Sequence, residues 1–181
     1  KIDSLNTKNS ISIYASQGAI VKTGELNMTG ATIEADASTL NQKDSGAVFA
    51  TGTGTVVTLD RSTLSLIPNI SITGVKLTDV DRYVGFGLFS ESGAKINAKN
   101  NNIEIINGGS GVASIGLSEI DLSGARLKYK GKGYAVYTDG VGKVNLSGTK
   151  ITLDGYSTAF ELDLSLPPAS RPITTDVNTK I

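Results

Sequence analysis

The sequence has no cysteine, no histidine and no tryptophan, and only one methionine and four prolines in 181 residues. Without cysteine or histidine, the chain offers no disulfide, thiolate nucleophile, Ser-His-Asp triad or zinc site of thiolates and imidazoles. Its 17 basic and 17 acidic side chains balance, so we expect no general attraction to nucleic acid or anionic lipid. The sequence therefore predicts no metal, no cofactor and no nucleic-acid partner.

Long apolar runs are also missing, and none approaches the roughly 20 residues of a membrane-spanning helix. The chain starts at Lys1 without the basic and apolar segments of a signal peptide, so we expect an excised fragment or a processed product. The lack of cysteine does not by itself identify a compartment. What the chain has instead is glycine, serine, threonine and asparagine at 71 positions, which favours short strands and tight turns over helices.

One phrase of alternating apolar and polar residues occurs five times along the chain. The copies are GELNMTGATIEA, GTVVTLDRSTLSL, GAKINAKNNNIEI, LSEIDLSGARLKY and GKVNLSGTKITL. Each copy contains two apolar-x-apolar segments around a corner, which is typical of two strands that each bury one face. A third apolar position precedes each phrase, so each repeat predicts three strands. The last three copies are 24 residues apart.

The aligned copies predict columns of buried residues. The first strand contributes Leu26, Val57, Ile96, Ile120 and Val144, and two residues later Met28, Leu59, Ala98, Leu122 and Leu146. The second strand contributes Ile33, Leu64, Ile103, Leu127 and Ile151, and then Ala35, Leu66, Ile105, Tyr129 and Leu153. The third strand contributes Phe49, Leu88, Val112, Val136 and Phe160. The corner holds residues that tolerate a left-handed backbone, namely Gly30, Asn100, Gly124 and Gly148.

A 24-residue unit with three one-sided strands cannot bury a core alone, but stacked units close a continuous one. We therefore predict an all-β, right-handed parallel β-helix of about six coils over residues 1–163, in which Ile11 and Ile13 form the second strand of a degraded first coil. Residues 164–181 are expected to be a cap or linker, because Pro168 falls where the next inward residue should be. A β-sandwich is the alternative, although antiparallel hairpins would not require constant spacing.

Two insertions interrupt the repeat at the same point, near residues 36–45 and 67–84. They are expected to leave neighbouring coils at one corner and to form one protruding patch. Its candidate binding residues are Asn41, Lys43, Asp44, Lys76, Asp79, Asp81, Arg82 and Tyr83. The alternative is that both loops are neutral insertions, since long loops cost little extra closure entropy.

The nearest approach to a catalytic group is Asp79, Asp81 and Arg82, because paired carboxylates can hold Ca²⁺ or transfer protons. All three fall in one insertion, so we interpret them as a solvated loop. Glu34 and Glu104 share an outward column in distant repeats and are also expected to be solvated. No catalytic residue is predicted.

Tyrosines are the remaining candidates for recognition, because exposed aromatic rings stack on sugars and anchor protein partners. Tyr129 falls in an inward column and is predicted to lie in the core. Tyr83, Tyr134 and Tyr137 are candidates for binding, and Tyr156 lies beside another glycine-containing turn.

The phrases GYAVYTDGVGKVNLSGTKITLDGYSTAFELD and GAVFATGTGTVVTLDRSTLSL resemble the passenger repeats of bacterial autotransporters, the type V secretion system. The resemblance covers roughly residues 18–163 and lies in rhythm and composition, without a catalytic signature. It implies export to the cell surface or secretion, with a parent protein anchored by an outer-membrane β-barrel outside this chain. Members of the family adhere, intoxicate, aggregate or digest, so the resemblance does not select among these activities.

These observations favour a non-enzymatic, surface-exposed or secreted module for adhesion or host-receptor binding. Its expected partner is a host-cell receptor, a glycan or a neighbouring bacterial cell, which it would contact through the two insertions. The first alternative is a spacer in a larger adhesin or toxin. The second is a carbohydrate-active β-helix enzyme, against which the missing acid pair argues.

Overall fold

The computed structural model describes most of the chain and is all-β. The described residues are 4–8, 11–24, 27–32, 46–59, 63–66, 86–106, 110–130, 133–155, 157–163 and 172–181. They form three six-stranded sheets with parallel strands and contain no α-helix. Each sheet takes every third strand of the chain, so each repeat contributes one strand to each sheet.

The three sheets are named here A, B and C. Sheet A contains β1 (Ser4–Lys8), β4 (Asn27–Thr32), β7 (Thr63–Leu66), β10 (Asn102–Ile106), β13 (Arg126–Lys130) and β16 (Lys150–Asp154). Sheet B contains β2 (Ile11–Ala15), β5 (Gly46–Thr51), β8 (Phe86–Glu91), β11 (Ser110–Ser114), β14 (Tyr134–Thr138) and β17 (Thr158–Leu162). Sheet C contains β3 (Ile20–Thr23), β6 (Val56–Leu59), β9 (Lys95–Asn97), β12 (Glu119–Asp121), β15 (Lys143–Asn145) and β18 (Ile173–Thr174).

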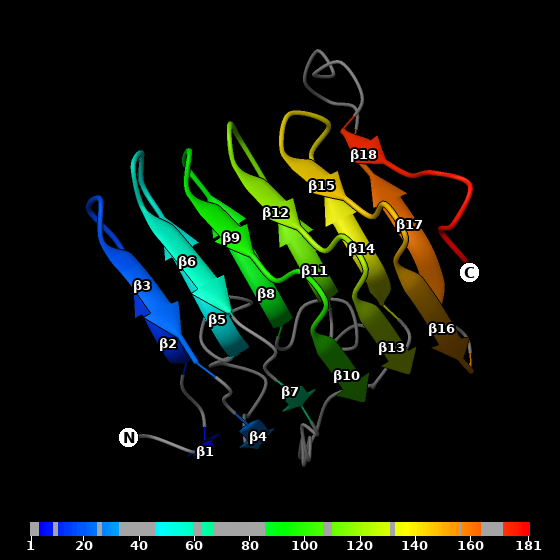
Figure 1. Ribbon diagram of the computed structural model, residues 1–181, viewed down its shortest axis with the longest axis horizontal. Helices are drawn as coiled ribbons and strands as arrows, with labels where there is room; N and C mark the ends of the chain where they lie inside the picture. Colours follow the sequence, from blue (N-terminus) through cyan, green and yellow to red (C-terminus); the bar gives the residue numbers. More distant parts are fainter. Residues whose placement is uncertain are drawn as a thin grey trace, which may run out of the picture.

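Successive repeats lie side by side along the long axis of the molecule, from the blue N-terminal strands to the red C-terminal ones (Figure 1). The side chains that face inward from all three sheets form one core cluster, which includes Leu88, Ile120 and Leu127. This arrangement is consistent with a parallel β-helix, because stacking gives each repeat the apolar cover that it lacks alone.

Most of the predicted columns are confirmed from the second copy onward. Backbone register pairs Val57 with Ile96, Ile96 with Ile120, and Ile120 with Val144. Tyr129, predicted to be core, is fully buried. The corner prediction also holds at Asn100, Gly124 and Gly148, whose φ angles are 57°, 70° and 66°.

The predicted alignment of the first copy is wrong. Strand β3 places Val21 beside Val57, so Val21 takes the position assigned to Leu26, which lies outside the described residues. Met28 pairs with Leu64 and therefore belongs to the second strand, at the position assigned to Ile33. Both GAIVKT and GELNMT begin with glycine and place an apolar residue, Val21 or Leu26, shortly after it, so the apolar pattern alone permits either register.

Three further predictions at this end of the chain change with that register. Gly30 lies inside β4 and not at a corner. Thr29, not Glu34, pairs with Ser65 in the outward column, and Glu34 lies outside the described residues. Ile13 pairs with Val48, so the segment expected to be a second strand belongs to the third-strand sheet, sheet B.

The third-strand column is wrong by one residue in β5. Val48 pairs with Leu88 and joins the main core, whereas Phe49 pairs with Phe89 on the opposite face of sheet B. Val48 and Phe49 are both apolar, and so are Leu88 and Phe89. The alternation of apolar and polar residues therefore did not distinguish the inward residue from the outward one. A shift of one residue reverses the face to which a strand side chain points.

The C-terminal tail continues the sheet pattern after its proline-rich part. Ile173, and not Pro168, occupies the next inward position, because β18 pairs Ile173 with Val144. Lys180 then donates to the Thr149 carbonyl at 3.0 Å and accepts from the Ile151 amide at 2.7 Å. The described part of the tail, residues 172–181, thus covers backbone groups of the last full repeat.

Buried hydroxyl groups stabilise the turn between sheets B and C. The Ser118 hydroxyl lies 2.8 Å from the Ser90 carbonyl and 2.9 Å from the Ser114 hydroxyl. In the next repeat the Thr138 hydroxyl donates to the Gly142 carbonyl at 2.6 Å. These short side chains find hydrogen-bond partners inside the buried turn, so their own polar groups are satisfied there.

Candidate functional site

The two predicted insertions begin and end at paired strands. One connects β4 to β5 and the other connects β7 to β8. Because β4 pairs with β7 and β5 pairs with β8, both insertions leave sheet A and enter sheet B at neighbouring positions. The expectation that they start at the same point of the repeat is therefore confirmed.

The loop residues predicted to bind a partner lie outside the described residues. They are Asn41, Lys43, Asp44, Lys76, Asp79, Asp81, Arg82 and Tyr83. Tyr156 also lies outside them. Both insertions end at strands of sheet B, β5 and β8, whose outer face is therefore the described surface next to them.

Aromatic side chains gather on the outer face of sheet B. Register places Tyr14, Phe49, Phe89 and Tyr137 in one column, interrupted by Ala113. A second column holds Phe86 and Tyr134, separated by a serine. We call this set, with the residues between them, the aromatic face.

The N-terminal half of the aromatic face is closely packed. The Phe49 ring lies 5.4 Å from both the Tyr14 ring and the Phe89 ring, and Phe86 contacts Phe89 edge-on at 5.4 Å. Phe86 lies directly over Gly46, where any side chain would overlap its ring. The three phenylalanines are at most 5% exposed, whereas Tyr14 is 59% exposed. The phenylalanines therefore form a second apolar cluster on the outer side of the sheet.

The C-terminal half of the aromatic face combines tyrosines with carboxylates. Tyr134 and Tyr137 are half-buried, and their ring centres are 6.3 Å apart. Glu161 pairs with Tyr137 in the next strand. Burial raises the pKa of Tyr137, and the nearby carboxylates of Asp163, Asp139 and Glu161 raise it further. Two of the tyrosines predicted to bind are thus brought together in an acidic environment.

Asp139 is positioned by backbone amides. Its carboxylate accepts from Val141 at 3.0 Å, from Gly142 at 2.9 Å and, across to the preceding repeat, from Gly116 at 2.7 Å. Three amide donors fix this negative charge at the end of β14. It therefore acts as a fixed charge beside Tyr137.

Charge is distributed unequally among the sheets. The described strands of sheet B contain two glutamates, Glu91 and Glu161, and no lysine or arginine. All eight basic residues of the described strands lie in sheets A and C: Lys8, Lys22, Lys95, Arg126, Lys128, Lys130, Lys143 and Lys150. The neutral chain thus carries one acidic, aromatic face.

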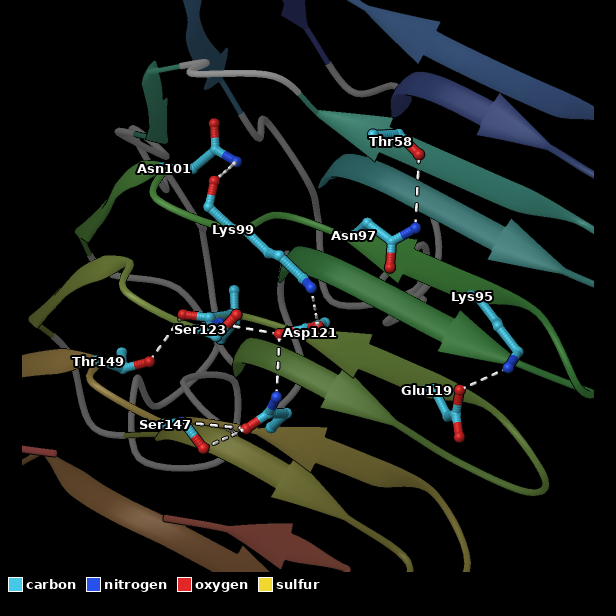
Figure 2. Close-up of polar contacts among 12 residues, drawn as sticks. Thr58, Lys95, Asn97, Lys99, Asn101, Glu119, Asp121, Ser123, Ser147 and Thr149 are labelled. Carbon is cyan, nitrogen blue, oxygen red and sulfur yellow. Dashed lines mark hydrogen bonds and ion pairs between the residues drawn. The ribbon is translucent and has the colours of Figure 1, made fainter. Parts of the chain in front are cut away.

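The outer face of sheet C is polar and makes contacts within itself. Figure 2 shows Thr58, Asn97 and Asp121 following one another across β6, β9 and β12. Asn97 donates to Thr58 at 3.4 Å, and Lys99 approaches the Asp121 carboxylate at 3.1 Å. Glu104 on sheet A likewise pairs with Lys128 at 2.7 Å, both partly exposed. Exposed pairs of this kind contribute little stability.

Lowering the pH is expected to remove stability that Asp121 provides. Burial raises the pKa of Asp121, but hydrogen bonds from Ser123 and the neighbouring Lys99 ammonium outweigh that effect and hold it below 3.8. A carboxylate whose pKa is lower in the folded than in the unfolded state stabilises the fold at pH values above its unfolded-state pKa. This contribution is lost as the pH falls through its folded-state pKa. Between pH 5 and pH 2 the melting temperature of Asp121→Asn should therefore decline less than that of the parent. Parallel declines, followed by circular dichroism, would contradict this role.

The described residues contain no group of three or more acidic side chains arranged to hold a metal ion. In the same part of the chain no helix is long and apolar enough to cross a membrane.

No protein-family model, curated protein or solved structure matches the chain. The resemblance to autotransporter passengers therefore rests on the sequence pattern alone.

Sequence reasoning missed the aromatic face because it placed Phe49 inward. The signal was present, since GAVFATG and GFGLFSES align Val48 with Leu88 and Phe49 with Phe89 when their C-terminal turns are superimposed. That alignment predicts two outward phenylalanines in neighbouring repeats.

Proposed function

We propose that this chain is a non-enzymatic passenger segment of an autotransporter, exposed at the bacterial surface or secreted. It forms a right-handed parallel β-helix of about six coils, whose two insertions bind a host-cell receptor, a glycan or a neighbouring bacterial cell. One observation carries the proposal: both long insertions start and end at paired strands, and so leave an otherwise regular stack side by side.

Adjacent loops on a rigid stack suit recognition, because the scaffold fixes the loop ends while the loops vary in sequence and length. The aromatic face begins at the same strands, but its phenylalanines there are at most 5% exposed, so a bound partner would reach it through Tyr14 on the neighbouring strand β2, which is 59% exposed. Aromatic residues supply much of the binding energy of protein interfaces.

A spacer function is the second candidate, and the outer face of sheet C favours it. Two lysines at this face pair with neighbouring carboxylates, Lys95 with Glu119 at 2.7 Å and Lys99 with Asp121 at 3.1 Å. A surface that satisfies its own charges in this way suits a stalk that lifts another domain. A spacer predicts no saturable binding by the isolated chain.

Replacing residues 67–85 with Ile-Asn-Gly-Gly is expected to abolish binding without unfolding the protein. The replacement is the sequence of residues 106–109, which makes the same connection from sheet A to sheet B in the next repeat. Fluorescently labelled parent and variant would be titrated onto epithelial cells and onto a glycan array. We expect saturable binding by the parent and at least a tenfold loss in the variant, equivalent to about 1.4 kcal/mol.

The control is the double variant Lys95→Gln and Glu119→Gln, which removes an exposed ion pair from sheet C. It should bind like the parent. Unchanged binding by the loop replacement would refute the role of this insertion, and absence of binding by the folded parent would favour the spacer.

A further inference from the structure

The acidic and aromatic character of sheet B is strongest around β14 and β17. The rings of Tyr134 and Tyr137 on β14 lie 6.3 Å apart, and Glu161 pairs with Tyr137 from the next strand. Asp139 and Asp163 immediately follow the ends of these two strands. Three carboxylates therefore border two half-buried rings.

This combination is suited to a cation. The face of a tyrosine ring attracts an ammonium or guanidinium group, and the attraction is stronger where the ring is partly shielded from water. An arginine side chain can also lie flat on a ring while it donates to a carboxylate beside it. Anionic partners would meet only carboxylates, because the described strands of sheet B contain no basic residue.

We propose that the outer face of β14 and β17 binds a basic segment of a partner protein, with arginine or lysine side chains placed over Tyr134 and Tyr137 and beside Glu161. Charge complementarity identifies the occupant. This surface is formed by residues of the regular strands, so the proposal does not rest on either insertion.

A second copy of the chain is a weaker candidate for the occupant. Its most basic strand is β13, which carries Arg126, Lys128 and Lys130. Lys128 already pairs with Glu104 at 2.7 Å, and Lys130 pairs with Asp154 at 3.1 Å. Two of its three cations are thus neutralised by neighbours, whereas a basic segment of another protein brings its charges uncompensated.

The test uses fluorescein-labelled peptides of nine arginines or nine glutamines, titrated into the full chain and followed by fluorescence anisotropy. Two-dimensional carbon–proton NMR spectra of the tyrosine rings show where the peptide makes contact. We expect the arginine peptide to bind and to shift the Tyr134 and Tyr137 ring signals, and the glutamine peptide to do neither.

Variants separate this site from general attraction to negative charge. Glu161→Gln and Tyr137→Leu should each weaken arginine-peptide binding by about 5- to 10-fold. Tyr137→Phe keeps the ring and should retain most of the affinity. Glu104→Gln removes one negative charge from sheet A and should leave binding unchanged.

Three results would overturn the proposal: equal losses in Glu161→Gln and Glu104→Gln, tyrosine signals that do not move, or binding that survives Tyr137→Leu. Concentration-dependent self-association that Lys128→Gln weakens would overturn it as well, because it would assign the face to a second copy. Replacement of residues 67–85 tests the proposed loop function separately and should leave peptide binding intact.

Discussion

Leu122→Asp is expected to destabilise the protein by more than about 4 kcal/mol and to melt the repeats around it. Leu122 is fully buried in the main core cluster, and its equivalents in the flanking repeats, Ala98 and Leu146, are fully buried too. A carboxylate at this position would be surrounded by apolar side chains, with neither a hydrogen-bond donor nor water beside it. Burying a charge without a partner is among the costliest single changes to a fold.

The matched control is Leu117→Asp, the same substitution five residues earlier at a side chain that is 82% exposed. It should change stability by no more than about 0.5 kcal/mol. Urea denaturation followed by circular dichroism measures both. Equal stabilities of the two variants would contradict the inward assignment of Leu122, while Leu122→Ala should fall between them, with a loss of about 2–5 kcal/mol.

The inward position of Leu122 could be predicted because the repeat is most regular there. From Ile96 to Ile120 and on to Val144 the spacing stays at 24 residues. At constant spacing, one alignment places the apolar residues of each strand in shared columns, such as Ile96, Ile120 and Val144. The stacked fold of this region could therefore be predicted from the 24-residue repeat alone.

The N-terminal repeats could not be aligned in this way because their spacing varies. Val21 and Val57 are paired although they are 36 residues apart, and Val57 and Ile96 although they are 39 apart. Where the number of residues between repeats varies, only the apolar pattern is left to define the register. Leu26 fits that pattern as well as Val21 does. The glycine turn resolves the choice, since Gly18 and Gly54 both have positive φ and precede equivalent strands.

The candidate site was predictable only in part. The shared starting point of the insertions follows from the repeat, because equivalent positions in successive repeats must be neighbours. The acidic, aromatic face does not, because it depends on which of two adjacent apolar residues points outward. For Phe49 and Val48 that choice is made by packing, where Phe49 completes an external cluster with Phe86 and Phe89.

Gly142→Ala is expected to destabilise the protein by about 3 kcal/mol, which lowers the melting temperature by roughly 6–12 °C. A Cβ at Gly142 would overlap the carbonyl group of Ser114 in the preceding repeat and lie 2.7 Å from the Ile115 amide nitrogen. These are backbone atoms, so no rotamer change can relieve the overlap. Gly142 itself is held by hydrogen bonds with Asp139 and Thr138 at 2.9 and 2.6 Å, so the turn at Gly142 and the end of β11 would have to move apart.

Gly24→Ala separates this steric effect from the loss of glycine flexibility. No atom lies within 4 Å of a Cβ built at Gly24, so the added methyl group meets nothing and the unfolded chain loses freedom. This variant should be neutral or up to about 1 kcal/mol more stable than the parent. Thermal melts of the two variants should therefore move in opposite directions or differ by several degrees. If Gly142→Ala melts with Gly24→Ala, the close approach of neighbouring repeats at this turn is not what requires glycine.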